Sequence, residues 1–331
     1  MSSGETMKLA AAILFLPFLA PQETAKEIAW KTDFKATVKE AAASKKLVVL
    51  VFQSKDRKNC LRFQNETLAD ANVMAALGKY LCVRINPEGT DDENRLWQDY
   101  KMPTPPMTFV LEPDGKQLCA VTALNPKVYG PMLHDIVPAY FEKIVPSREA
   151  LAKDANQPGP HRALGEAYMT LDNSTDSAKH FAAAADLMAG KGEKAMALEL
   201  LSKQIDIYYD KKWYSPARGC CSRIADLDPD NKSGKRPMAA WVLGMASCNE
   251  GRWAEAIDGL KEACVKYKDS DLLPKMMFTL GSAHMYAKDI DAAITVFETI
   301  VKNYEGTETA DISRVQAEKL REQRQKKTED K

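Results

Sequence analysis

The sequence lacks the residue patterns of a metalloenzyme, a nucleotide-binding protein or a nucleic-acid-binding protein. Its four histidines, His134, His161, His180 and His284, are scattered, and none stands at metal-ligand spacing. No glycine-rich phosphate loop occurs. Lysine plus arginine equals aspartate plus glutamate at 46 each, so no excess positive charge favours a phosphate backbone or an anionic membrane surface. We therefore predict no cofactor, no bound metal and no nucleic-acid partner.

The cysteines lack the spacing of a redox or zinc site. None of the seven lies in a CxxC pair or near a histidine at zinc spacing. An odd number in an exported protein leaves at least one thiol unpaired within a monomer. Cysteine is also among the residues most often buried, so the simplest interpretation is that most of the seven are small apolar core residues.

The N-terminal apolar segment is too short to cross a bilayer as a helix. It follows Lys8 and extends from Leu9 to Ala20. A basic residue followed by a short apolar stretch is typical of a secretory signal. We therefore predict a signal peptide and leader over residues 1–25, export to the periplasm or the cell exterior, and no stable membrane insertion after signal removal. The alternative is a buried apolar helix.

Residues 27–145 alternate between helical and strand patterns. The run 47–52 is β-branched and aromatic, as in a central strand buried on both faces. Further strands are expected at 81–85, 107–111 and 117–121, and a Pro-Asp-Gly turn between the last two predicts a hairpin. Helices are expected over 34–45, from about residue 60, and over 69–80, 91–100 and part of 126–144. This order predicts a mixed α/β sandwich.

The order and spacing of these elements resemble the thioredoxin superfamily. The local motif that carries the resemblance comprises Cys60, Arg62, Phe63, Thr67, Leu68, Asp70 and Val73. Pro106 stands where the superfamily has its proline before the final hairpin, so the resemblance implies a cis peptide bond there. Arg57, however, stands where the superfamily has its nucleophilic cysteine. Because disulfide exchange begins with attack by a thiolate, dithiol cycling is chemically unavailable at this site.

Three interpretations of this degenerate site remain open. Cys60 could act as a single reactive thiol, with its pKa lowered by Lys55, Arg57 and Lys58. The same three basic residues could bind an anion at the start of a helix. The loop could instead be solvated and Cys60 a core residue.

Residues 148–308 contain internal repeats. Gly165, Gly244 and Gly281 each follow a leucine, and a large apolar residue follows each glycine at a similar distance. A further copy between the first two, around Tyr208 and Ala217, has lost its glycine. These features resemble tetratricopeptide repeats, whose usual period is about 34 residues. The resemblance implies stacked antiparallel helix pairs. The charged composition of 309–331 predicts a terminal helix and tail.

The repeats predict a partner-binding groove. Each first helix should present a stripe of residues offset from its glycine, because positions i and i+4 share one helix face. The predicted groove residues are Trp241, Met245, Asn249, Phe278, Ser282, Met285 and Tyr286, with Arg162, Glu166 and Met169 in the earlier repeat. Methionine and aromatic side chains are typical of binding surfaces, although periodic apolar residues are also common in cores.

The sequence thus predicts a thioredoxin-like α/β sandwich followed by an all-α array of tetratricopeptide-like repeats. The function it favours is that of an exported adaptor without enzymatic activity, which binds a protein or peptide in the groove of the repeats. The alternative is a monothiol thiol-disulfide oxidoreductase that uses Cys60, with the repeats selecting its protein substrates.

Overall fold

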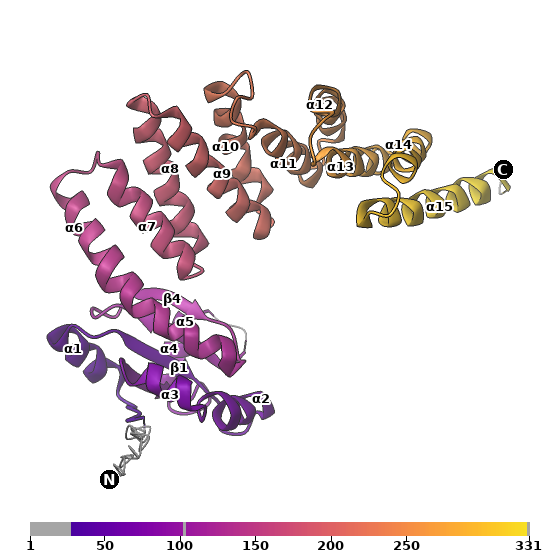
Figure 1. Cartoon of the computed structure of the whole chain (residues 1–331). Coiled ribbons are helices and arrows are strands. Elements are labelled where there is room, and N and C mark those ends of the chain that lie inside the picture. Colours follow the sequence, from indigo (N-terminus) through magenta and orange to yellow (C-terminus); the bar gives the residue numbers. More distant parts are fainter. Residues whose placement is uncertain (1–27, 102–103, 330–331) are drawn as a thin grey trace, which may run out of the picture. The chain divides into compact units, whose positions relative to one another are not determined.

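The chain divides into two units in a computed structural model that describes residues 28–101 and 104–329 (Figure 1). The first unit is Met1–His134 and the second is Asp135–Lys331, with the division inside helix α5 (Pro126–Pro138). The predicted signal peptide lies outside the described residues. Within the described ranges, no helix is both long and apolar enough to cross a membrane.

The first unit is built on a four-stranded mixed sheet in the order β2-β1-β3-β4. Strand β1 (Val48–Phe52) pairs in parallel with β2 (Leu81–Ile85) and antiparallel with β3 (Met107–Leu111), which continues into the hairpin strand β4 (Gln117–Val121). All five residues of β1 are buried, which confirms the prediction of a central strand covered on both faces.

Helices of the first unit begin where the sequence provides caps. The Asp33 side chain accepts from the Ala36 backbone at the start of α1, and Thr90 forms a capping box with Glu93 at the start of α4. One feature that the sequence did not predict is the π-helical segment η1, which continues α2 without a break. The helices are α1 (Phe34–Ser44), α2 (Lys58–Arg62), η1 (Phe63–Thr67), α3 (Ala71–Leu77) and α4 (Asp91–Asp99).

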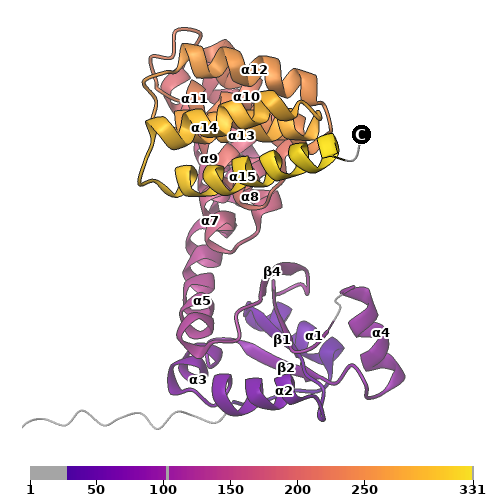
Figure 2. The same cartoon turned by 90° about the vertical axis from the view of Figure 1, so that its right-hand side faces the viewer.

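The second unit is entirely helical, as predicted. Consecutive helices from α7 onward pack against one another in an array (Figures 1 and 2). The elements are η2 (Ala139–Ile144), α6 (Val145–Lys153), α7 (Pro158–Thr170), α8 (Ser174–Gly190), α9 (Lys194–Asp210), α10 (Tyr214–Leu227), α11 (Arg236–Asn249), α12 (Trp253–Lys266), α13 (Leu273–Tyr286), α14 (Ile290–Asn303) and α15 (Glu308–Glu329).

Three of the helix pairs meet at a glycine. A Cβ atom added at Gly165 would lie 2.5 Å from the Phe181 ring, and one added at Gly244 would lie 2.6 Å from the Leu260 side chain. A Cβ atom added at Gly281 would lie 2.7 Å from the Phe297 ring. In each pair the large residue comes 16 positions after the glycine (165 and 181, 244 and 260, 281 and 297). The glycines are therefore required by close approach of a side chain from the second helix.

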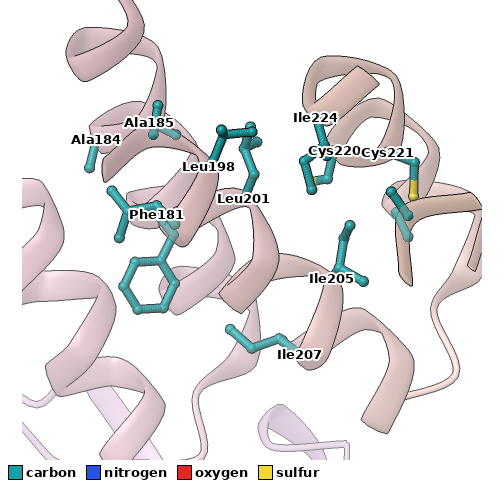
Figure 3. Packing of buried hydrophobic residues seen from close by; sticks show 14 of the residues in the cluster. Phe181, Ala184, Ala185, Leu198, Leu201, Ile205, Ile207, Cys220, Cys221 and Ile224 are labelled. Carbon is teal, nitrogen blue, oxygen red and sulfur yellow. The ribbon is translucent and has the colours of Figure 1, made fainter. Parts of the chain in front are cut away.

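The α9–α10 pair lacks this glycine because large and small residues exchange places. Ile205 stands 16 positions before Cys221, and both are buried in one cluster (Figure 3). A residue with positive φ also follows seven positions after Gly165, Ile205, Gly244 and Gly281; these residues are Asp172, Lys212, Gly251 and Lys288. The second pair is thus a full repeat in which a bulky first-helix residue faces a small second-helix residue.

The terminal helix α15 is more than a charged solvated helix. Ala310, Ala317 and Leu320 are buried in the same cluster as residues of α14, and Ser313 is buried on the same face. This face lets α15 cover the last helix pair, which would otherwise expose its apolar side.

Candidate protein-binding groove

A cavity of about 800 Å³ lies along the first helices of the last two helix pairs. Helices α11 and α13 supply most of its wall, and the ends of α9, α10, α12 and α15 complete it. Aromatic side chains dominate the lining, which comprises Tyr209, Tyr214, Trp241, Met245, Cys248, Asn249, Trp253, Lys275, Phe278, Thr279, Ser282, Tyr286, Glu308, Thr309 and Ile312. All of these residues belong to the second unit.

Trp241 forms a fixed part of the cavity wall. Its side chain is only 6% exposed, and its indole Nε1 donates a 2.9 Å hydrogen bond to Thr279 Oγ1. The Tyr209 ring packs beside it with centroids 5.3 Å apart. The Lys275 ammonium lies 5.4 Å from the centroid of the Trp241 ring, within the range of a cation–π contact.

A second aromatic group stands at the other end of α13. Trp253 and Tyr286 stack with ring centroids 5.1 Å apart and planes inclined by 18°. Tyr286 is 61% exposed, and Asn249 beside this end is also exposed. Tryptophan and tyrosine are among the residues that most often dominate the energetics of protein interfaces, so this pair is a candidate contact site.

Six of the seven residues predicted for the groove line this cavity, all except Met285. Met285 is half-buried and packs against the cluster formed by α14 and α15, because it lies one position away from the stripe that contains Tyr286. Trp241 both lines the cavity and belongs to the core between α11, α12 and α13. Trp241 therefore lies in the cavity wall and in the core at the same time.

Nine lining residues lie outside the predicted stripes, and they include Tyr209, Tyr214, Trp253 and Lys275. Tyr214 and Trp253 each begin the second helix of a pair, α10 and α12. An aromatic residue repeated at the start of second helices was a signal in the sequence that could have found them. The contribution of α15 to the wall had no such signal, because it depends on how the terminal helix packs.

The earlier repeat does not extend the aromatic groove. Arg162 on α7 pairs with Glu166 at 3.0 Å and with Glu199 on α9 at 3.7 Å. Lys203 lies 3.5 Å from Glu166 and 3.6 Å from Glu199, so the four charges neutralise one another. Met169 is exposed. Arg162 and Glu166 therefore form an ion network here instead of lining the cavity.

In the first unit, Arg57 is held by a carboxylate that the sequence analysis missed. Its Nη2 lies 2.6 Å from Glu88 Oε1, and Ser54 Oγ donates to the other carboxylate oxygen. These hydrogen bonds, first that from Ser54, hold the pKa of Glu88 below its ordinary value. Glu88 follows β2 and Ser54 follows β1, and the C-terminal ends of parallel strands share one sheet edge. That topology could have located Glu88.

Glu88 neutralises one of the three charges of the predicted anion site. Glu88 pairs with Arg57, and Lys55 is exposed. Lys58 is exposed at the start of α2. An incoming anion would meet two exposed lysines and would have to displace Glu88 to reach Arg57.

Cys60 is fully buried, and the predicted lowering of its pKa is wrong. Burial raises the pKa of the Cys60 thiol, and this effect exceeds the opposing effects of a backbone hydrogen bond from Ser54 and the charge of Arg57. All seven cysteines have free thiols. The described residues contain no group of three or more histidine, cysteine or carboxylate side chains placed to hold a metal ion. The Pro105–Pro106 peptide bond is cis, the geometry predicted for it.

Two family models match parts of the sequence. Residues 29–113 match a model described as thioredoxin-like, and residues 276–307 match one described as a tetratricopeptide repeat. A search of curated protein sequences found no match.

Solved structures similar to the chain fall into the same two groups. A thioredoxin from Thermus thermophilus is 17% identical, with 33% of this chain and 85% of that chain covered and a TM-score of 0.30. The kinesin light chain TPR-like repeats of Podosopora anserina are 11% identical, covering 54% and 98%, at a TM-score of 0.38. Pseudomonas aeruginosa pilF is 16% identical, covering 57% and 91%, at 0.34. On the family models, the chain combines a thioredoxin-like domain with tetratricopeptide repeats.

Proposed function

We propose that this chain is an exported adaptor that docks a protein partner in the groove of its tetratricopeptide repeats. The observation that carries the proposal is the cavity between α11, α13 and α15, lined by Trp241, Trp253, Phe278 and three tyrosines. Tryptophan and tyrosine are the residues that most often dominate the energetics of protein interfaces.

The thioredoxin-like domain serves in this proposal as a structural or recognition module. Arg57 takes the place of the attacking thiol and is held by Glu88, while Cys60 is buried and less acidic than an ordinary thiol. Both observations weigh against the monothiol alternative, because thiol exchange requires an accessible thiolate.

Export is the part of the proposal that rests on sequence alone. Its support is Lys8 and the apolar run from Leu9 to Ala20. Deletion of residues 1–20 should leave a folded protein that remains in the cytoplasm of an expressing cell. Loss of folding on that deletion would mean that the run is part of the core, and export would have to be abandoned.

The docking proposal is tested on the exposed end of the groove, where a variant is least disruptive. Trp253→Ala combined with Tyr286→Ala removes the stacked pair, and Trp213→Ala is the matched control because Trp213 is 41% exposed and outside the cavity. Affinity capture with each full chain should retain the same partners for the wild type and Trp213→Ala, and lose them for the double variant. Circular dichroism checks that helix content is equal. Equal capture by all three chains would refute docking in this groove.

A further inference from the structure

Lys275 carries a charge that the protein does not neutralise. Within the described part of the chain Lys275 forms no ion pair, and its ammonium lies over the ring of Trp241. The corresponding first helices of the earlier pairs place Arg162 and Lys203 against Glu166 and Glu199, so there the charges cancel. An ammonium beside an indole, without a carboxylate, is a ready partner for an incoming anion.

Polar groups beside Lys275 are already used within the protein. Thr279 Oγ1 accepts from Trp241 Nε1 and donates to the Lys275 carbonyl at 3.0 Å, and Ser282 Oγ donates to the Phe278 carbonyl at 2.9 Å. Lys275 is the one cation in the lining, and together with the aromatic surface it suits a peptide with one acidic and one large apolar side chain.

The length of the groove sets the spacing between those two side chains. Lys275 and Tyr286 are 11 positions apart on α13 (275 and 286), which at 1.5 Å per residue is about 16 Å along the helix axis. An extended peptide covers about 3.3 Å per residue, so about five residues span that distance. An acidic side chain at Lys275 would then place an apolar side chain four to five residues away, against Trp253 and Tyr286.

We propose that the groove binds an extended internal segment of a protein partner, in which an acidic side chain lies about four to five residues from a large apolar one. The acid pairs with Lys275, and the apolar residue packs on Trp253 and Tyr286. This inference rests on the proposed docking function and adds the chemistry of the partner. Glu308, exposed at the start of α15, is the one carboxylate in the lining, and it disfavours a second acidic group near that wall.

A random library of 12-residue peptides, displayed with their C-termini fused to a phage coat protein, tests this directly on the full chain. Fusion removes free terminal carboxylates, so any acid selected is a side chain. Enriched peptides should carry Asp or Glu four to five positions from Trp, Phe or Leu. The most enriched peptide, synthesised with acetylated and amidated ends, should bind Lys275→Met about 10-fold more weakly or worse, as expected for loss of a charge-assisted contact.

Controls separate the specificity from the docking function. Lys268→Met removes an exposed lysine outside the cavity and should bind the peptide like the wild type, while Glu308→Gln should bind it at least as tightly. Peptides that need Trp253 but lack an acid, or that bind Lys275→Met equally, would overturn the acidic specificity and leave docking intact. A library without enrichment, peptides indifferent to Trp253→Ala, or preferential binding of an oligosaccharide array would overturn both.

Discussion

The two halves of the helical array share one scaffold and differ in what their first helices present. The position three residues before the repeat glycine, or before Ile205 in the second pair, holds Arg162 in α7 and Ser202 in α9, but Trp241 in α11 and Phe278 in α13. In the first half the charges pair with one another, whereas in the second half aromatic rings surround a cavity. Packing residues therefore set the scaffold, and a few residues offset from them decide whether a surface is charged or aromatic.

A glycine at the helix-pair contact should show the largest effect on stability. Gly281→Ala places a methyl group 2.7 Å from the Phe297 ring, which is too close for either helix to keep its position. Overpacking of this kind costs about 1–3 kcal/mol. Urea unfolding should show a lower free energy for the variant, with the loss confined to the second unit if its repeats unfold separately.

The control for this variant is another helical glycine. A Cβ added at Gly259 on α12 meets nothing within 4 Å, so Gly259→Ala should be neutral or should stabilise by up to about 1 kcal/mol through helix propensity. If both variants lose the same stability, the close contact between α13 and α14 is not what requires Gly281.

The first half should also respond to acid through a histidine pair. His161 and His180 face each other with their Nδ1 atoms 3.0 Å apart, and the Tyr168 ring stacks on His180. Burial, and next the charge of His161, lower the pKa of His180 to about 4. Lys179 and Arg148 act in the same direction and Asp176 opposes them.

The sign of the change in stability depends on whether the unfolded or the folded chain binds the proton at the higher pH. The unfolded chain protonates His180 near pH 6.5 and the folded chain only near pH 4, so stability falls as the pH decreases across that window. Because the His180 side chain is only partly buried, a loss of about 1–2 kcal/mol is expected. The difference in unfolding free energy between the wild type and His180→Gln, measured from pH 7.5 to 4, isolates this group from the carboxylates. A difference that stays constant with pH would contradict the assignment.

Much of the fold was predictable because local patterns and packing agree. The strand runs, the caps at Asp33 and Thr90, and the glycine spacing all follow from short-range rules. The exchange of large and small residues at Ile205 and Cys221 could not be recognised from the sequence, because such an exchange between two helices leaves no glycine as a marker. The Glu88 partner of Arg57 and the wall formed by α15 depend on contacts between distant segments, which periodicity does not encode.

The turns between paired helices should show a smaller effect on stability, and its sign should be opposite in the two turns compared. Gly251 takes φ 72° after α11, while Lys288 takes φ 65° at the same place after α13. This conformation costs a residue with a Cβ about 1–2 kcal/mol relative to glycine. The greater conformational freedom of glycine in the unfolded chain offsets part of that difference. Lys288→Gly should therefore stabilise by about 0.5–1 kcal/mol, and Gly251→Lys should destabilise by a similar amount. Thermal unfolding of both variants checks the pair, and a shift of the same sign in both would contradict the argument.

The smallest effect is expected from the ion network that distinguishes the first half. Glu166→Gln removes the carboxylate shared by Arg162 and Lys203, which are each about one-third exposed. Because water and salt screen such pairs, the cost should be about 0.5 kcal/mol at low salt and should shrink in 1 M NaCl. Glu298→Gln on α14, which loses a partner of Arg321 in the second half, serves as the matched comparison. A loss for Glu166→Gln above about 2 kcal/mol that persists in high salt would mean that the network holds α7 against α9, as the aromatic core does between α11 and α13. The contrast between a self-neutralised half and an aromatic-lined half would then need a different physical basis.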